Sequence, residues 1–351
     1  MLSSLSSNVV LAKARAKYGK RLKEKDYRNL LDCKSVTEIA AYLKANTAYH
    51  DVLTGVNEYD IHRGQLEVLI KQKLFYNLSS FVRYELSVGE QLADYVIART
   101  EIEEILDALM LMTAGRQEEY SQAAPLFLSK HTKIHMEQFA NIKNYGEFLE
   151  ALGNSVYRKL LAPYEPKPGE PVDVFAVENE LYSYLFSHVQ DIIDHRVKGK
   201  TKKEVKELFQ GYIDLENYAR IIRMKRRFRA QPEFIEKSLL PFGSLKPKQL
   251  SAMVHAESAN QAAAVFRTTS RGKKVANVEY NFVDELAQRM RFLSGKHYIH
   301  FSSHPPVVLL SYIFLADTEV HNITTIVEGI RYQVPVDDIK KLLILPTENA
   351  G

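Results

Sequence analysis

The 351-residue sequence lacks several features that would place it in a common class of protein. Cys33 is the only cysteine, so no disulfide can form within the chain, which fits a reducing cytosol. The most apolar run, Pro305 to Ala316, is shorter than the roughly twenty residues that span a bilayer. The sequence has no G-x-x-x-x-G-K-S/T phosphate loop, no G-x-S-x-G elbow and no H-E-x-x-H motif. We therefore expect no transmembrane segment, no catalytic residues and no cofactor.

The composition is typical of a soluble globular protein. Hydrophobic residues make up 46% of the chain and charged residues 26%. A formal net charge of +4 is slight for this length and does not by itself indicate nucleic-acid binding. The chain exceeds what one core usually supports, so we expect two or three substructures. Apolar residues recur at helical spacing and no convincing β-hairpin pattern occurs, which predicts an all-α fold.

One helical pattern occurs three times. Between Thr201 and Arg229, apolar residues recur every three or four positions and form a stripe along an amphipathic helix. A matching stripe occurs earlier in the chain and another occurs later, each with one position that breaks the pattern. The stripes are Leu92, Tyr95, Ile102, Ile105 and Leu109; Val205, Leu208, Tyr212, Leu215, Tyr218 and Ile222; and Leu310, Ile313, Val320, Ile323 and Val327.

Acidic residues mark the same positions in each copy. A carboxylate directly precedes the mid-helix apolar residue, as Glu101, Asp214 and Glu319. A second acid, followed by an aliphatic residue, lies upstream at the same distance every time, as Glu67, Glu180 and Glu285. General acid/base chemistry is one interpretation of the second set. Threefold recurrence favours a structural role, such as pairing with a neighbouring helix.

Helix-start signals repeat at similar distances. Ser35 to Glu38, Asn144 to Glu147 and Ser258 to Gln261 each predict a capped short helix. Further boxes at Ser87 to Glu90 and Thr201 to Glu204 are expected to begin long helices. The third long helix is expected to start at prolines 305 and 306. The segment 46–49 after the first capped helix is echoed by 154–157 after the second.

These signals divide the chain into three helical repeats, which we place at residues 1–115, 116–230 and 231–351. Each repeat is a short capped helix followed by a long helical hairpin. The four prolines between Pro163 and Pro171 predict a stiff extended linker. Ser270 to Lys274 is expected to form a turn between helices. Periodic Val10, Ala14 and Leu22 predict that the N-terminal segment is the first helix of the fold rather than a cleaved presequence.

Two sets of histidines have spacings that occur in metal sites. His297, His300 and His304 form one set, and His131 with His135 forms the other. Neither set includes a cysteine, and the acid nearest to the second pair would face away from it on a helix. Prolines follow His304 directly and interrupt the first set. We therefore predict no metal site.

Arginines gather at the end of the second long helix, and the densest basic run covers residues 223–229. This run could contact RNA, anionic lipid headgroups or an acidic protein partner. The alternative is a solvated helix end, where cations complement the helix dipole. The run lacks aromatic residues arranged for base stacking, so we expect no nucleic-acid binding.

The triplication, together with the segment from Lys17 to Leu53, resembles the C subunit of the rotary V-type and archaeal-type ATPases, the relative of the eukaryotic d subunit. Asp214-Leu-Glu-Asn217 and Glu319-Val-His-Asn322 resemble the second and third signatures of that family. Glu101-Ile-Glu-Glu104 departs from them by carrying Glu in place of Asn, which puts the polar role of that position in doubt. The resemblance covers essentially residues 1–345.

The resemblance implies a pseudo-threefold funnel of three similar helical repeats. It implies a non-catalytic central-rotor subunit that links the central stalk to the membrane proteolipid ring and transmits torque between ATP turnover and proton or sodium transport. Such a protein is cytoplasmic and peripheral to the membrane through the ring. On this interpretation Arg220, Arg223, Arg226 and Arg227 line a surface that faces an acidic partner. The competing hypothesis is a helical-repeat adaptor or RNA-binding scaffold, and copurification with a proteolipid ring or with nucleic acid would distinguish the two.

Overall fold

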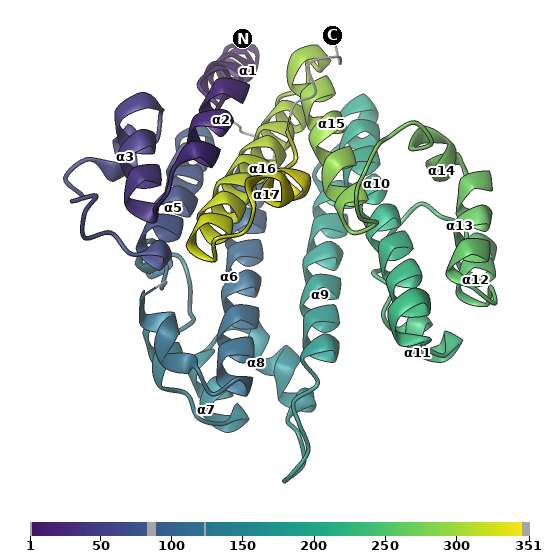
Figure 1. The fold of residues 1–351 in the computed structure, drawn as a ribbon. Helices are drawn as coiled ribbons and strands as arrows, with labels where there is room; N and C mark the ends of the chain where they lie inside the picture. The colour runs from purple at the N-terminus through teal and green to yellow at the C-terminus, as the bar shows by residue number, and fades with distance from the viewer. Residues whose placement is uncertain (1, 83–88, 123, 346–351) are drawn as a thin grey trace. The chain divides into compact units, whose positions relative to one another are not determined.

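The computed structural model describes residues 2–82, 89–122 and 124–345, and every regular element in these ranges is a helix (Figure 1). The predicted all-α fold is confirmed. Three pairs of long helices dominate the described chain. They are α5 (Arg63–Val82) with α6 (Gly89–Thr113), α9 (Val174–His195) with α10 (Gly199–Arg223), and α15 (Glu285–Phe301) with α16 (Pro305–Arg331).

Shorter elements connect these pairs or flank them. The α-helices among them are α1 (Leu2–Gly19), α2 (Glu24–Asp32), α3 (Val36–Asn46), α4 (His50–Leu53), α7 (Tyr145–Ala151), α8 (Val156–Leu161), α11 (Pro232–Lys237), α12 (Pro247–Val254), α13 (Ala259–Thr268), α14 (Ser270–Lys274) and α17 (Val336–Leu342). The tighter or wider turns are η1 (Gln117–Gln122), η2 (Leu126–Leu128), η3 (Met136–Asn141), η4 (Ala162–Tyr164) and the π-helical η5 (Met224–Phe228).

The three apolar stripes face the interior, as their spacing predicts. Every stripe residue on α6 and α16 is buried, and so is every one on α10 except Tyr212, which is half-buried. Arg99 and Asp317 occupy the same position on the other two helices, and both are also half-buried. The break in the pattern therefore marks the edge of the buried face in all three copies.

The three short capped helices begin with the same hydrogen bonds. The side-chain oxygens of Ser35, Asn144 and Ser258 accept from the backbone N–H three residues later, at 3.2, 2.9 and 3.2 Å. The Glu or Gln at that later position reaches back to the N–H of the residue before the cap, at 2.7, 2.8 and 2.9 Å. Each cap thus satisfies one backbone donor of the first helical turn and one of the residue before the cap, which fixes where the helix starts.

Three local predictions need correction. α10 begins at Gly199 with Lys198 at the cap, so Thr201 is not a capping residue; the Glu204 carboxylate instead accepts from the Ser302 hydroxyl at 2.8 Å. Residues 270–274 form α14 rather than a turn. The proline-rich linker contains a turn at 168–169, where Gly169 has φ +88, so it is not uniformly extended. The box at Ser87 lies outside the described residues, and the proline start of α16 is confirmed.

The chain divides into two compact units. Unit one comprises the described residues of 1–15 and 186–318, and unit two those of 16–185 and 319–351. Within unit one, Arg15 on α1 caps the end of α15 by donating from Nε to the Ile299 carbonyl at 2.8 Å and from Nη2 to the Ser302 carbonyl at 2.7 Å. Unpaired carbonyls at a helix C-terminus favour such a cation.

An apolar cluster of unit two joins segments from both ends of the sequence. Residues between Leu22 and Ile70 pack against the last part of α16 and against α17. Ile39 and Leu43 of the first capped helix are fully buried there, together with Ile323 and Val327 of the third long stripe. Helix α3, near the start of the chain, therefore shares a core with the C-terminal part of α16.

Candidate functional site

The mid-helix carboxylates of α6 and α16 are both held by tyrosine hydroxyls. Tyr157 donates to Oε2 of Glu101 at 2.8 Å, and Tyr49 donates to Oε1 of Glu319 at 2.9 Å. Both tyrosines are buried and end the related segments 46–49 and 154–157. Tyr49 directly precedes the short helix α4, and Tyr157 lies in the short helix α8. The backbone N–H of Leu22 also donates to Glu319, at 2.7 Å.

The corresponding carboxylate of α10 is held by an arginine. Nε of Arg271 donates to Oδ2 of Asp214 at 3.3 Å, and both side chains are nearly fully buried. Arg271 follows the cap Ser258 at the same distance as Tyr157 follows the cap Asn144. The backbone N–H groups of Ser244 and Leu245 also donate to Asp214, at 2.7 and 3.0 Å.

Two glycines allow this arginine to approach. A Cβ on Gly211 would lie 2.9 Å from Nη1 of Arg271, and a Cβ on Gly243 would lie 2.5 Å from Oδ1 of Asp214. Real Cβ atoms do not make contacts this short, so any larger residue would displace the pair. Glycine at both positions therefore leaves the ion pair the room that it occupies in this structure.

Three residues after the carboxylate, α10 and α16 each carry an asparagine. Its side-chain amide makes two hydrogen bonds to the backbone of one later residue. Asn217 donates to the Leu240 carbonyl at 2.9 Å and accepts from the Leu240 N–H at 2.7 Å. Asn322 does the same with Ile344, at 2.9 Å in both directions. All four groups are buried, so these amides satisfy backbone that would otherwise lack partners.

Glu104, which replaces the asparagine in the first copy, has a polar role of its own. Its side chain is almost fully buried, accepts from the Tyr120 hydroxyl at 2.9 Å and pairs with Lys71 at 3.2 Å. Burial raises the pKa of Glu104 and the nearby Lys71 charge opposes that rise. The doubt raised by its departure from the family signature is thus resolved: the position stays polar and anchors η1 to α6.

The upstream acids do not share one partner. Glu285 pairs with Arg289 on its own helix, Glu180 accepts from the Tyr164 hydroxyl at 3.0 Å, and Glu67 lies 3.6 Å from Arg63 one turn earlier. Oε1 of Glu67 is buried without a hydrogen-bond partner, and burial raises the pKa of that carboxyl. The expected pairing with a neighbouring helix therefore does not describe the set.

The structure brings only part of the predicted arginine surface to the exterior. Arg220 is 5% exposed and donates from Nη1 to the Ser238 carbonyl at 2.9 Å, so it lies in the interior of unit one. Arg223 is half-buried and pairs with Asp284 at 2.9 Å. Arg226 and Arg227 are exposed on η5, beside Phe228, which is 70% exposed. The exposed part of this surface is thus the turn at the end of α10.

The predicted histidines contact other side chains of the protein. His304 faces Glu204 across 3.1 Å, His131 packs edge-on against the Phe75 ring, and His297 packs against Phe301. Across the described ranges, no three His, Cys, Asp or Glu side chains are placed to hold a metal ion.

The single thiol is half-buried. Cys33 donates to the Asn29 carbonyl at 3.3 Å, and burial raises the pKa of the thiol. A raised thiol pKa disfavours the reactive thiolate, so this arrangement is that of a structural cysteine.

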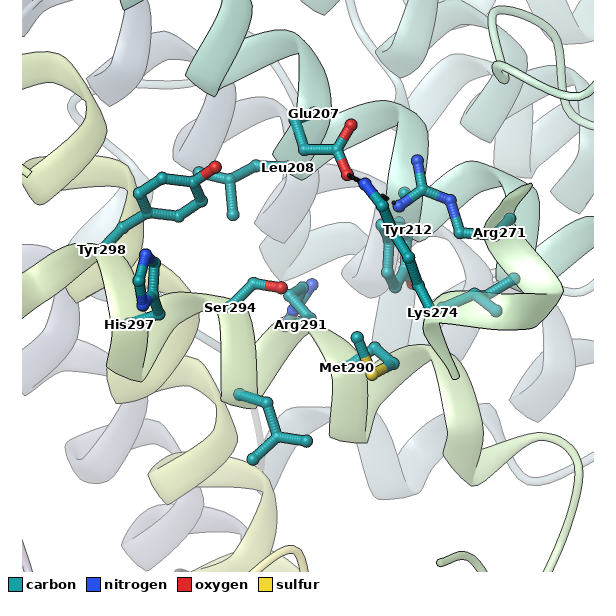
Figure 2. A pocket seen from close by; sticks show the side chains of 13 residues that line it. Glu207, Leu208, Tyr212, Arg271, Lys274, Met290, Arg291, Ser294, His297 and Tyr298 are labelled. Atoms are coloured by element: carbon teal, nitrogen blue, oxygen red, sulfur yellow. Dashed lines mark hydrogen bonds and ion pairs between the residues drawn. The ribbon is translucent and has the colours of Figure 1, made fainter. Parts of the chain in front are cut away.

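Unit one contains a cavity of about 280 Å³ between α10, α14 and α15 (Figure 2). Figure 2 shows Glu207, Arg271 and Lys274 together at one end, and His297 and Tyr298 at the other. Oε1 of Glu207 accepts from Arg271 at 3.0 Å and from Lys274 at 2.7 Å. Leu208 and Leu215 of α10 and Met290 and Leu293 of α15 add apolar side chains to the lining.

Comparison with known proteins identifies the family. The family model for the ATP synthase (C/AC39) subunit matches residues 10–342. The chain belongs to this family. A similar protein is the C subunit of the A-type ATP synthase of Pyrococcus abyssi (strain GE5 / Orsay), which is 21% identical over 345 residues, covering 95% of this chain and 88% of the relative. The resemblance to the C subunit of V-type and archaeal-type ATPases is thereby confirmed. None of the described helices is long and apolar enough to cross a membrane.

The main contacts that sequence inspection missed are the donors to the repeated carboxylates. Tyr157 and Arg271 lie 56 and 57 residues from their acceptors, and Tyr49 lies 270 residues away. One available signal was the common spacing of Tyr157 and Arg271 after their helix caps. A search for donors at that offset would have found both.

Proposed function

We propose that this chain is a non-catalytic central-rotor subunit of a V-type or A-type rotary ATPase. It links the central stalk to the membrane proteolipid ring and transmits torque between ATP turnover and proton or sodium transport. The observation that carries this proposal is the family match over residues 10–342. Its partners are the other subunits of the complex, and its association with the membrane is peripheral, through the ring.

The repeated contacts support a mechanical role. Torque transmission requires a body that resists twisting, and close-packed helices with few alternative packings deform little under load. In this chain a buried or half-buried carboxylate on each of α6, α10 and α16 is tied by a hydrogen bond or ion pair to a segment of another repeat. These ties oppose sliding of the long helices along the short ones.

We further propose that three repeats, with boundaries at 1–115, 116–230 and 231–351, form the pseudo-threefold funnel. The order of the contacts supports this arrangement. Tyr157 of repeat two contacts Glu101 of repeat one, and Arg271 of repeat three contacts repeat two at Asp214. Tyr49 of repeat one then contacts repeat three at Glu319. Such a cyclic order is what a pseudo-threefold axis requires.

A coupling assay tests the proposed role. The rotary complex would be assembled in vesicles with and without this chain, and ATP hydrolysis and ion transport would be measured on the same sample. We expect ion transport to depend on the chain, while hydrolysis by the catalytic head continues without it. Full transport by a complex that lacks the chain contradicts the proposal. Copurification with nucleic acid in place of the ring and stalk would favour the scaffold hypothesis.

For the contact surface, we propose that Arg226 and Arg227 face an acidic subunit, with Arg223 at the edge and the buried Arg220 supporting the segment from within. Residues 223–237 carry six cationic side chains and two acidic ones, an excess equal to the formal net charge of the whole chain. Such local charge complementarity steers association with an oppositely charged surface.

The matched test is a pair of double charge reversals. Arg226→Glu with Arg227→Glu should weaken assembly with the ring or stalk by about tenfold at low salt, and less at high salt. Lys130→Glu with Lys133→Glu changes exposed residues and the net charge equally at a distant sequence position, and should leave assembly unchanged. Equal effects of the two variants remove the arginines from the contact surface.

A further inference from the structure

The turn between α9 and α10 carries a basic run that the proposed arginine surface does not include. Residues 196–203 contain five cationic side chains and no acidic one. Lys202 pairs with Asp194 at 2.9 Å. The other four are exposed, and none of them forms an ion pair with the residues that the structure describes. These four are Arg196, Lys198, Lys200 and Lys203.

The turn between α15 and α16 packs against the start of α10. The Glu204 carboxylate accepts from the Ser302 hydroxyl at 2.8 Å and lies 3.1 Å from Nδ1 of His304. Glu204 directly follows Lys203, and Ser302 directly follows Phe301, the last residue of α15. The Phe301 side chain is 77% exposed. A large exposed apolar ring therefore lies near the basic turn, and both belong to unit one.

Charge and an exposed aromatic ring together fit an anionic lipid surface. Clusters of about four to eight lysines and arginines are attracted to negatively charged lipid headgroups. An aromatic side chain beside such a cluster adds binding when it enters the boundary between headgroups and acyl chains. Three of the four exposed cations are lysines, whose ammonium groups are compact, strongly hydrated point charges on flexible stems. Such groups suit a mobile layer of headgroups better than a fixed, bidentate contact with carboxylates.

We propose that Arg196, Lys198, Lys200, Lys203 and Phe301 form a contact surface for anionic phospholipids, which we call the hairpin-end surface. The four cations attract the lipid phosphate groups, and the ring of Phe301 enters the boundary between headgroups and acyl chains. This inference goes beyond the proposed function, in which membrane association is through the ring. Its test needs neither the ring nor ATP turnover, so the two proposals can fail independently.

Vesicle cosedimentation of the purified full-length chain tests the proposal. One set of vesicles contains only phosphatidylcholine, and the other also contains phosphatidylglycerol. We expect binding to the anionic vesicles at low salt to be at least about tenfold tighter than binding to the neutral ones, and to weaken as salt screens the charges. Equal binding to the two sets, or no binding to either, overturns the proposal.

A triple charge reversal locates the lipid contact. The variant that carries Lys198→Glu, Lys200→Glu and Lys203→Glu should bind anionic vesicles at least about a hundredfold more weakly, because each cation near such a surface contributes roughly fivefold. The control makes the same change in net charge at three exposed lysines of unit two and should bind within about threefold of the wild-type chain. An equal loss in both variants overturns the assignment of the surface. The control substitutions are Lys130→Glu, Lys133→Glu and Lys143→Glu.

A single aromatic substitution separates lipid from other polyanions. Phe301→Ser leaves every charge in place and should weaken binding to anionic vesicles by about fivefold, because the inserted apolar ring is lost. Phe228→Ser, at a position on η5 that is 70% exposed, is the control and should leave vesicle binding unchanged. Unchanged binding of Phe301→Ser would mean that charge alone holds the vesicles, as it would an acidic protein or nucleic acid, and overturns the inference. An equal or larger loss in Phe228→Ser overturns the assignment to the hairpin-end surface.

Discussion

In the two units, different donors bind the carboxylate at the equivalent position of a long helix. In unit two, neutral tyrosine hydroxyls bind Glu101 and Glu319, whereas in unit one the Arg271 guanidinium binds Asp214. The carboxylate is also one methylene shorter in unit one. The comparison shows that the helix register fixes where the contact occurs, while the space around it decides which side chains make it.

A single small residue accounts for much of that space. Gly211, one turn before Asp214, lets the guanidinium lie against the α10 backbone. Alignment of the three stripes places alanines at the corresponding positions, Ala98 on α6 and Ala316 on α16. Because an added Cβ at Gly211 would meet the arginine at 2.9 Å, the alanines are compatible with a tyrosine contact and not with this arginine.

The largest effect is expected where a charge loses its counter-ion. Arg271→Met removes the cation beside Asp214, which is 1% exposed, and also one of the two cations that share Glu207. Breaking a buried ion pair usually lowers the free energy of unfolding by about 3–5 kcal/mol. The remaining donors from Ser244 and Leu245 place our expectation near the lower value, about 3 kcal/mol.

Urea unfolding followed by far-ultraviolet circular dichroism measures this loss. Lys273→Met, at an exposed position two residues further on, is the matched control and should change stability by less than about 0.5 kcal/mol. A loss of less than about 1 kcal/mol in Arg271→Met would mean that the ion pair contributes no more than a neutral hydrogen bond. The contrast between the two units would then be one of shape alone.

The second test uses the feature that the units share. Asn217→Ala in unit one and Asn322→Ala in unit two each leave one buried N–H and one buried carbonyl without a partner. At about 1–3 kcal/mol for each of the two unsatisfied groups, we expect similar losses of roughly 2–6 kcal/mol from both variants. Thermal and urea unfolding of the two proteins would measure this. A loss from one variant together with no measurable loss from the other would show that the two amides are not equivalent.

Local features of the fold could be predicted from sequence, because they depend on residues within one or two helical turns. The stripe from Leu92 to Leu109 and the cap at Ser35 are examples, and both were confirmed. Thr201 failed as a cap because the helix starts two residues earlier and Glu204 bonds to Ser302 instead. The prediction that Arg220 lies on the surface was wrong, because its spacing places it on the buried side of α10. The prediction relied on the dense run of positive charge and not on that spacing.

The candidate sites were harder to predict because distant segments form them. The partner of Glu319 lies 270 residues away, and the cavity requires α10, α14 and α15 together. The long helices themselves follow from periodicity, but the packing of a short helix on a long helix that is distant in the sequence does not. The hairpin-end surface likewise depends on the contact between Glu204 and Ser302, which lie 98 residues apart in the sequence.

A smaller effect is expected for the neutral donor of unit two. Tyr157→Phe keeps the ring and removes one hydrogen bond to Glu101, so the free energy of unfolding should fall by about 1–2 kcal/mol. Tyr59→Phe, at a position that is 80% exposed, is the control and should leave the free energy of unfolding unchanged. The comparison between units predicts that Tyr157→Phe loses clearly less stability than Arg271→Met. A reversed order would contradict the view that the ion pair is the stronger of the two ties.

The smallest expected effect is on the pH dependence of stability. It distinguishes the tyrosine contacts of unit two from the ion pair of unit one. Burial raises the pKa of Glu101, although hydrogen bonds from Thr132 and Tyr157 oppose the rise. A carboxyl with a higher pKa in the folded state binds its proton more tightly there than in the unfolded chain. Its contribution to stability is therefore greatest below the unfolded pKa and is lost as the pH rises through the folded pKa.

Glu101→Gln removes this titration and keeps an oxygen that accepts from Tyr157. Between pH 7 and the ordinary range of a glutamic acid, the wild-type chain should gain stability relative to Glu101→Gln as the pH falls. The measurement is the difference in urea midpoint between the two proteins at successive pH values, which cancels the titration of every other group. A difference that stays constant with pH would mean that Glu101 has the same proton affinity in the folded and unfolded states. The hydroxyl donors of unit two would then offset the effect of burial on the pKa of Glu101 as fully as a cation would.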